Sequence, residues 1–243
     1  MADDPAEPTG DTGAPQPPAG QPRRYGGKTA DERRVERRAR LIEAALELFG
    51  TTGYHGTTIR AVIRESGLGE RYFYESFATL EDLLIATAQD AQGRIMQTVL
   101  DAIDDMQGMG FEASLDHAMR RLADAFERDP RVLRIAMMET IGVSDAVTKA
   151  RTEILNNFVN LLAGTAHSFG TIDERESELL SIGLLGAANE MLMRYSTKEI
   201  GADLPTVIAE LEIIISGTYE AAVARAEARS RAAATPSATD DAP

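Results

Sequence analysis

Two tyrosines and an arginine beside a glycine turn have residue types that suit a polar binding surface. They lie in the segment GLGERYFYESF. On a helix, Phe73 and Phe77 lie four residues apart on one side, and Tyr72 and Tyr74 turn away from them. A tyrosine combines an apolar ring with a hydroxyl that needs a hydrogen-bond partner, so two of them beside Arg71 indicate a surface that meets a polar molecule.

The sequence motifs of catalytic and metal-binding sites are either absent or lack the flanking residues and strands that such sites require. The chain has no cysteine, which excludes disulfides, thiolate catalysis and cysteine-bound zinc. His55, His117 and His167 are too far apart in the sequence to indicate a metal site, and no GxSxG motif is present. GGKT lacks the first glycine of a phosphate-binding loop, because Pro22 occupies that position, and GMGFEA has no strand before it. We therefore expect neither an enzyme nor a cofactor.

Charge is distributed unevenly along the 243 residues, whose net charge is −14. Residues 1–20 hold four acidic residues and no basic one, and residues 21–71 hold eleven Lys and Arg against seven Asp and Glu. The remainder holds fourteen against twenty-eight, so only the second segment is basic. A short basic segment before an acidic body is typical of a polyanion-binding head, but a solvated helix face explains the charge equally well.

The composition, with 43% apolar and 26% charged residues, suits a chain with one or two ordinary cores. Its longest nearly apolar run, LLSIGLLGAA, is too short to span a bilayer. The N-terminal MADDPAEPTG is acidic and lacks the apolar core of a secretory signal. We therefore expect a cytoplasmic location and no interaction with a membrane.

The two ends of the chain differ in composition from its middle. Residues 1–28 and 230–243 are rich in small residues, proline and aspartate, and have too few large apolar side chains to offset the entropy of folding. We predict a disordered N-terminal arm and a disordered C-terminal tail. Between them, almost every segment has helical periodicity and no run alternates like a strand, which predicts an all-α fold.

The first strong helical pattern begins near Asp31 and is expected to end at Gly50 and Gly53. Its first turns are crowded with arginines, among them Arg38. Positive charge at that end is unfavourable for the helix dipole, so stability alone does not explain these side chains. The predicted apolar stripe consists of Val35, Leu41, Ile42, Ala45, Leu46 and Phe49.

A second helix and a short third helix follow, joined by a glycine turn. Thr57 or Thr58 can cap the second helix, and Gly67 can take the positive φ that ends it. Two helices joined in this way, the second carrying aromatics and an arginine, form the helix-turn-helix pattern, in which the second helix enters the DNA major groove. Many helical hairpins have a glycine turn, so the pattern alone leaves a plain hairpin open.

Residues 39–84 contain several further motifs in a fixed order around the helix-turn-helix pattern. They read ARLIEAALELFGTTGYHGTTIRAVIRESGLGERYFYESFATLEDLL. An alanine-rich helix ends in Leu-Phe, and a Gly-Tyr turn, a threonine start, a glycine-apolar turn and aromatic-Tyr-x-x-Phe follow. In this order the motifs closely resemble the N-terminal domain of TetR-family transcriptional regulators. The rest of the chain resembles that family only in length and helicity.

The resemblance implies roles for individual residues. Tyr74 matches the family's phosphate-contacting tyrosine, and Phe73 and Phe77 match its packing positions. Gly69 stands where the family usually has a Ser or Thr cap, and Leu80 where a lysine is common, so one phosphate contact is expected to be missing. The candidate DNA-binding residues are Arg38, Thr58, Arg60, Glu70, Arg71, Tyr72, Tyr74 and Ser76.

From residue 79 the sequence predicts roughly six helical segments between glycine or proline breaks, and the first of them leads directly from the predicted head. Methionine fills irregular space and tolerates varied partners, so the Met- and Phe-rich middle suggests a cavity for a small-molecule effector. Ordinary core packing is the alternative for each of these side chains. The candidate ligand-binding residues are Met96, Leu100, His117, Phe126, Met137, Met138, Asn157 and Phe158.

Two helical segments near the C-terminus, 178–195 and 204–225, have small residues on one face. Such residues let helices approach closely, and four helices from two chains would form a bundle. Packing within one chain explains part of the same pattern. The candidate dimer-interface residues are Gly183, Gly186, Ala187, Glu190, Leu211, Ile214, Ile215 and Gly217.

We therefore predict a helix-turn-helix DNA-binding domain at residues 29–78 and a helical ligand-binding and dimerisation domain at residues 79–229. The expected function is transcription regulation by a homodimeric repressor that a small-molecule ligand releases from a palindromic operator in double-stranded DNA. A helical dimer that senses a ligand or binds a protein without binding DNA is the alternative.

Overall fold

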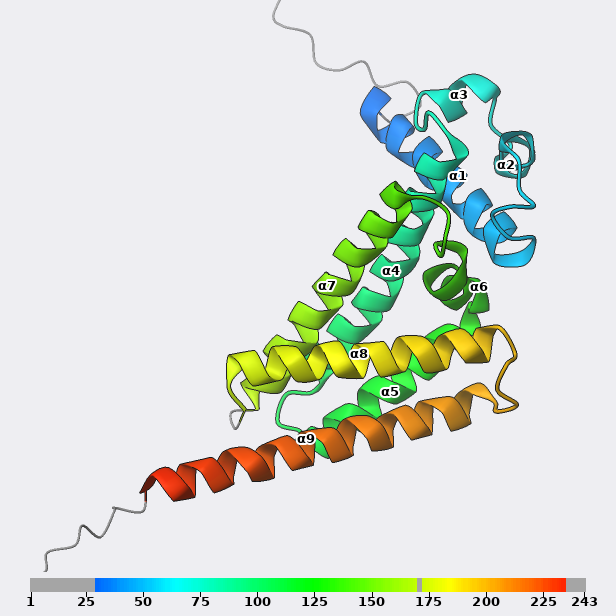
Figure 1. Ribbon diagram of the computed structural model, residues 1–243. Coiled ribbons are helices and arrows are strands. Elements are labelled where there is room, and N and C mark those ends of the chain that lie inside the picture. The colour runs from blue at the N-terminus through cyan, green and yellow to red at the C-terminus, as the bar shows by residue number, and fades with distance from the viewer. Residues whose placement is uncertain (1–28, 170–171, 235–243) are drawn as a thin grey trace, which may run out of the picture.

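The computed structural model describes residues 29–169 and 172–234, within which all regular elements are helical, as predicted (Figure 1). The predicted arm at residues 1–28 lies outside the described residues, and so do residues 235–243 of the predicted tail. The elements are α1 (Ala30–Thr51), α2 (Ile59–Ser66), α3 (Glu70–Tyr74), α4 (Leu80–Asp105), α5 (Phe111–Arg128), α6 (Pro130–Arg134), η1 (Ile135–Glu139), α7 (Asp145–Ser168), α8 (Glu174–Ser196) and α9 (Leu204–Ala234).

Local capping fixes the ends of the first two helices. At the start of α1, Thr29 Oγ1 accepts a hydrogen bond from the Glu32 amide, and a Glu32 carboxylate oxygen accepts one from the Thr29 amide. Each bond satisfies an amide that has no partner within the helix. At the start of α2, Thr58 Oγ1 accepts a single hydrogen bond from the Ala61 amide at 3.2 Å, and Gly67 ends α2 with a φ of 62°. As expected, Gly69 begins α3 without a side-chain cap.

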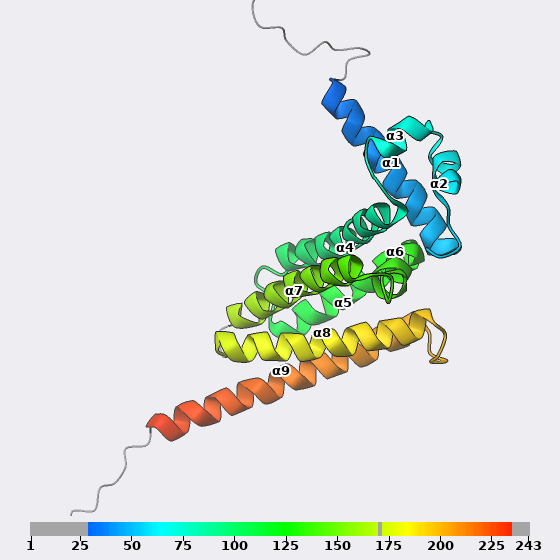
Figure 2. The same cartoon turned by 45° about the horizontal axis from the view of Figure 1, so that its top comes forward.

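Helices α1, α2 and α3 enclose a small apolar core at one end of the molecule, which we call the head (Figure 1). Fully buried side chains from all three helices meet there, including those of Leu41, Leu46, Phe49, Val62 and Phe73. The predicted stripe on α1 is right except at its first member. Val35 is 69% exposed because the first turns of α1 extend past this core (Figure 2).

Helix α4 connects the head to the remaining helices, which we call the body. It begins after the capping residue Thr79, contacts α1 in the head, and runs on to contact α5 and α7 (Figure 1). In both views α8 and α9 lie on the side of the body away from the head. Helix α9 continues to Ala234, past residue 230, where the tail was predicted to begin. None of the helices in the described ranges is long and apolar enough to cross a bilayer.

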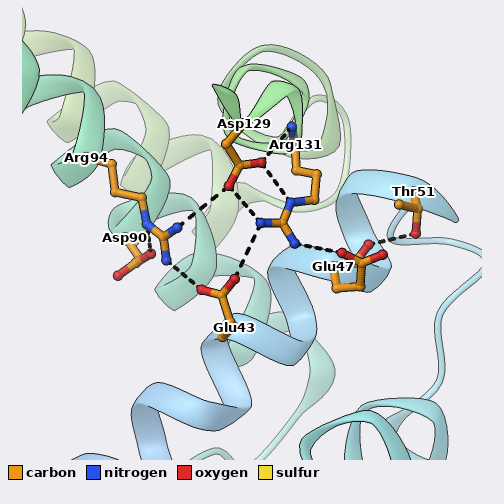
Figure 3. A network of polar contacts seen from close by, with 7 residues as sticks. All are labelled: Glu43, Glu47, Thr51, Asp90, Arg94, Asp129 and Arg131. Carbon is orange, nitrogen blue, oxygen red and sulfur yellow. Dashed lines mark hydrogen bonds and ion pairs between the residues drawn. The ribbon is translucent and has the colours of Figure 1, made fainter. Parts of the chain in front are cut away.

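A network of charged side chains joins α1, α4 and the start of α6 (Figure 3). Arg131 donates to Glu47 at 2.6 Å and to both oxygens of Asp129 at 2.7 Å. Arg94 bridges Glu43 and Asp90, each at 2.8 Å. The hydrogen bonds from Arg131 lower the pKa of the Asp129 carboxyl, against the opposing effect of its burial. Head and body are thus held together by ionised groups.

Gly50 lies at the centre of this junction and was wrongly expected to end α1, which continues to Thr51. A Cβ atom built on Gly50 would lie 2.5 Å from Cβ and 3.2 Å from Cα of Arg131. Neither is the far end of a flexible side chain, so α6 packs this closely on α1 only because residue 50 has no side chain. Gly53 ends the helix instead, with a φ of 88°.

We predict that Gly50→Ala lowers the free energy of unfolding by about 1 to 3 kcal/mol, because α6 must move away from α1 to admit the methyl group. Gly93→Ala is the matched control, since Gly93 is also helical and a Cβ there meets nothing within 4 Å. That control should gain about 0.5 to 1 kcal/mol, as alanine does in a helix interior. Urea denaturation measures both; equal stabilisation by the two changes would show that the close approach does not matter.

Candidate nucleic-acid interface and ligand cavity

The aromatic side chains of α3 divide between core and surface as predicted. Phe73 is 0% and Phe77 5% exposed, and their rings pack 6.1 Å apart. Tyr74 is 53% exposed and Tyr72 37%. The two phenylalanines therefore close the head, and the two tyrosines are available to a partner.

Ion pairs and a cation–π contact hold the exposed face of α3 in place. The Arg37 guanidinium lies 4.5 Å from the centre of the Tyr72 ring and 3.6 Å from the Glu75 carboxylate. Arg71 donates to the same carboxylate at 2.7 Å, although its side chain is 85% exposed. To contact a base, Arg71 must therefore break its ion pair with Glu75. Arg37, absent from the predicted set, positions Tyr72 from α1.

The remaining predicted DNA-binding residues surround α3 on the head. Arg38 is exposed on α1, with its guanidinium 5.0 Å from the centre of the Phe77 ring. Thr58 caps α2, and Arg60 is exposed in the first turn of that helix. Glu70 is exposed at the start of α3, and Ser76 is half-buried just after it. Their contacts with DNA stay a prediction, whereas the cap formed by Thr58 is a structural role.

The body contains an elongated apolar cavity of about 250 Å³ between α4, α5, η1, α7, α8 and α9. Its wall on α4 consists of Gln92, Ile95, Val99, Ile103 and Met106. These residues recur every three or four positions, so they form one stripe, which extends about 21 Å at the usual rise of about 1.5 Å per residue. The cavity is therefore suited to a long and narrow apolar molecule.

Three of the eight predicted ligand-binding residues line the cavity, and five do not. Phe126, Met137 and Phe158 lie in its wall. The other five are Met96, Leu100, His117, Met138 and Asn157.

The five corrections follow from the direction in which each side chain points. Met96 and Met138 pack against the core beside the cavity. Leu100 is 39% exposed, and Asn157 is also exposed. His117 lies on an outer surface, 3.4 Å from the Asp105 carboxylate. Composition indicated a region that contains a cavity, but which side chains face that cavity depends on how the helices are rotated.

Sequence reasoning missed both ends of the cavity. Phe111, Phe169 and Tyr219 meet at the end away from the head, where the Phe111 and Tyr219 rings stack 3.6 Å apart. Gln92 and Asn189 supply polar groups at the opposite end. These residues come from four helices and the C-cap of α7, so no local pattern in the sequence groups them.

One turn of π-helix connects the cavity with the head. Met137 on η1 lines the cavity, and Glu139, two residues later, accepts a hydrogen bond from the Tyr54 amide at 2.7 Å. Arg134 donates to Glu139 at 3.0 Å and to the Thr51 carbonyl at 3.3 Å. The cavity wall and the residue that contacts the turn between α1 and α2 are therefore two positions apart on the same helical turn.

The predicted dimer-interface residues fall on two sides of α8 and α9. Gly183, Gly186 and Glu190 are exposed on α8, beside Leu179 and Ile182, whose side chains are 61% and 51% exposed; Ala187 is half-buried. On α9, Ile214 and Gly217 are exposed. Leu211 and Ile215 instead line the cavity; Leu211 is buried and Ile215 is half-buried.

Comparison with known proteins agrees with this geometry. The family description "Bacterial regulatory proteins, tetR family" matches residues 41–87, which span α1 to the start of α4. The head therefore matches the N-terminal domain of TetR-family transcriptional regulators, as its sequence motifs predicted.

Two curated relatives extend the comparison. The fatty acid metabolism regulator protein of Bacillus subtilis is 20% identical over 74% of this chain and 94% of the relative. The HTH-type transcriptional regulator HbdR of an Aromatoleum species is 32% identical over 37% of this chain and 35% of the relative.

Solved structures show the same fold. A TetR-family regulator from Syntrophomonas wolfei matches with a TM-score of 0.64 and 16% identity, over 76% of this chain and 95% of that one. FadR from Bacillus subtilis, solved in complex with stearoyl-CoA, matches with a TM-score of 0.58 and 17% identity, over 73% of this chain and 96% of that one.

We predict that Tyr74→Phe weakens binding to all DNA sequences alike, because a hydroxyl that contacts a phosphate carries no sequence information. Fluorescence anisotropy with DNA selected by the wild-type protein, and with a scrambled duplex, measures the effect. Tyr195→Phe, on α8 in the body, is the control. Unchanged affinity of Tyr74→Phe for both duplexes would exclude a phosphate contact by this hydroxyl.

Arg71→Ala should act differently. If Arg71 reads a guanine, its removal costs about 1 to 3 kcal/mol and relaxes the choice at one base pair. Selection from a randomised duplex library shows whether a single position loses its preference. A preference that persists at every position would assign Arg71 only its ion pair with Glu75.

Proposed function

We propose that this protein is a homodimeric repressor that acts in the cytoplasm, binds a palindromic operator and leaves it when an elongated apolar ligand enters the body cavity. The observation that carries the proposal is the position of η1. This turn presents Met137 to the cavity and Glu139 to the head. An occupant that moves η1 therefore also moves the turn that begins α2.

Long-chain acyl compounds are the ligand class that suits the cavity best. Its wall is almost entirely apolar, and its α4 stripe has the length of an extended long acyl chain. A curated relative and a solved structure support the same class. The relative is named as a regulator of fatty acid metabolism, and the structure contains stearoyl-CoA.

Helix α4 provides a second route from ligand to DNA. It carries five residues of the cavity wall and also packs against α1 in the head. In a dimer the two heads must reach successive major grooves about 34 Å apart. A small rotation of α4 in each protomer changes that separation, and both heads can no longer bind at once.

We place the dimer interface, which would hold the two heads at this separation, on α8 and α9. The exposed stripe on α8 contains Leu179, Ile182, Gly183 and Gly186. Helix α9 packs against α8, and its Ile213 is 64% exposed. Apolar side chains grouped on paired helices are typical of a surface that a second copy covers.

We predict that Gly186→Arg yields monomers that no longer hold palindromic DNA. A Cβ atom built on Gly186 meets nothing within 4 Å in its own chain, so we expect the substitution to leave the fold intact. Gly164→Arg on α7, where a Cβ also has free space, is the matched control and should remain dimeric. Sedimentation velocity measures both; an intact Gly186→Arg dimer would place the interface elsewhere.

The proposed function is tested by release of DNA. Genomic fragments bound by the wild-type protein provide the operator, and fatty acids and acyl-CoA thioesters of increasing length are then added during an anisotropy measurement. We expect long-chain compounds to lower operator affinity and short-chain ones to have little effect, since short chains leave most of the cavity wall uncovered. Operator affinity that no acyl compound changes would contradict the proposal.

A further inference from the structure

We propose that Arg151, Thr140, Gln92 and Asn189 form a binding site for the carboxylate of a free long-chain fatty acid at the end of the cavity nearest the head. This inference rests on the proposed function of the cavity as an acyl-ligand site and names the ionic end of the ligand. The site is built from α4, the end of η1, α7 and α8.

Arg151 on α7 is a half-buried cation without an anion. Its Nη2 donates to the Asn189 side-chain carbonyl at 3.1 Å, and its Nε is buried with no hydrogen-bond partner. Within residues 29–169 and 172–234, no carboxylate lies within 4.0 Å of its guanidinium. Other half-buried arginines of the body differ, since Arg131 and Arg134 each contact a carboxylate at 3.0 Å or less.

A second unpartnered polar group lies beside it. Thr140, directly after η1, is 4% exposed, and its hydroxyl has no hydrogen-bond partner. Thr140, Arg151 and Gln92 line a small internal space of about 10 Å³. Such a space has room for about one water-sized atom group. Two buried donors near this gap, Arg151 Nε and the Thr140 hydroxyl, therefore have no hydrogen-bond acceptor among the described residues.

This small space adjoins the main cavity. Gln92, which is 8% exposed, lines both, and Asn189, the partner of Arg151, lines the main cavity. The α4 stripe that follows Gln92 is apolar as far as Met106. A molecule with an anionic end at Arg151 and an aliphatic chain along α4 would contact polar groups only at its first atoms.

Physical chemistry selects a carboxylate as the anion. A guanidinium forms its strongest hydrogen bonds with carboxylate and phosphate, and an uncompensated buried charge is strongly unfavourable. The small space excludes a nucleotide-sized group, and a thioester carries no charge at its acyl end. The site therefore fits a free acid rather than a coenzyme A thioester.

The location of the site also bears on regulation. Thr140 directly follows Glu139, which accepts the hydrogen bond from the head at Tyr54. A carboxylate held between Arg151 and Thr140 would thus sit next to the residue that contacts the α1–α2 turn.

Direct binding of three ligands of equal chain length to the full-length protein tests the site. Hexadecanoate, hexadecan-1-ol and hexadecanoyl-CoA would be titrated calorimetrically into the wild type, Arg151→Gln and Arg151→Lys. We expect the wild type to bind the acid more tightly than the alcohol. Arg151→Gln should lower affinity for the acid about ten- to hundredfold, as loss of a charged hydrogen bond does, and leave that for the alcohol unchanged.

Binding of the alcohol shows that the glutamine variant is folded, and Arg151→Lys should retain part of the preference for the acid. Equal affinity of Arg151→Gln and wild type for hexadecanoate would overturn the carboxylate site. Binding of hexadecanoyl-CoA alone, unaffected by either substitution, would also overturn it and leave the acyl-ligand function standing. Failure of all three ligands to bind would contradict both.

Discussion

The close approach of α6 to α1 at Gly50 and Arg131 is the contact on which the arrangement of head and body depends. Arg131 reaches Glu47 on α1 only because the backbone of α6 can lie against the bare backbone at Gly50. Helix α6 continues without a break into η1, whose Met137 forms part of the cavity wall. One short segment, α6 with η1, therefore contacts both the head and the cavity.

Two arginines show how charge is used in different ways in this fold. Arg131 is surrounded by Asp129, Glu43 and Glu47 (Figure 3), and its side chain is 28% exposed. Exposed ion pairs contribute little singly, but a shared, partly buried network disfavours other relative positions of α1 and α6. Arg151 has only an amide partner. Arg131 therefore stabilises the contact between α1 and α6, whereas Arg151 has no carboxylate partner in the described part of the chain, and we propose that the ligand supplies one.

The features that could be predicted from the sequence are those decided within a few residues. Thr57 or Thr58 was expected to cap α2 and Gly67 to end it; Thr58 is the cap and Gly67 ends the helix, because a cap and a positive φ depend on adjacent backbone. The division of Phe73 from Tyr74 follows from helical spacing on a short segment. Val35 and Met96 were misplaced, since the end of a core and the rotation of a helix are set by distant elements. No local pattern shows that Arg151 lacks an acidic neighbour, because that depends on the packing of four elements.

We propose that the cavity and the DNA-binding face are coupled through η1 and α4, and such coupling must be thermodynamically reciprocal. The dissociation constant of a long-chain fatty acid would be measured by equilibrium dialysis with the free protein and with the protein saturated by its operator. Typical coupling free energies of about 1 to 3 kcal/mol predict that operator weakens ligand binding roughly 5- to 150-fold, by the same factor by which ligand weakens operator binding. Equal ligand affinity with and without operator would show that the cavity and the DNA-binding face are not coupled.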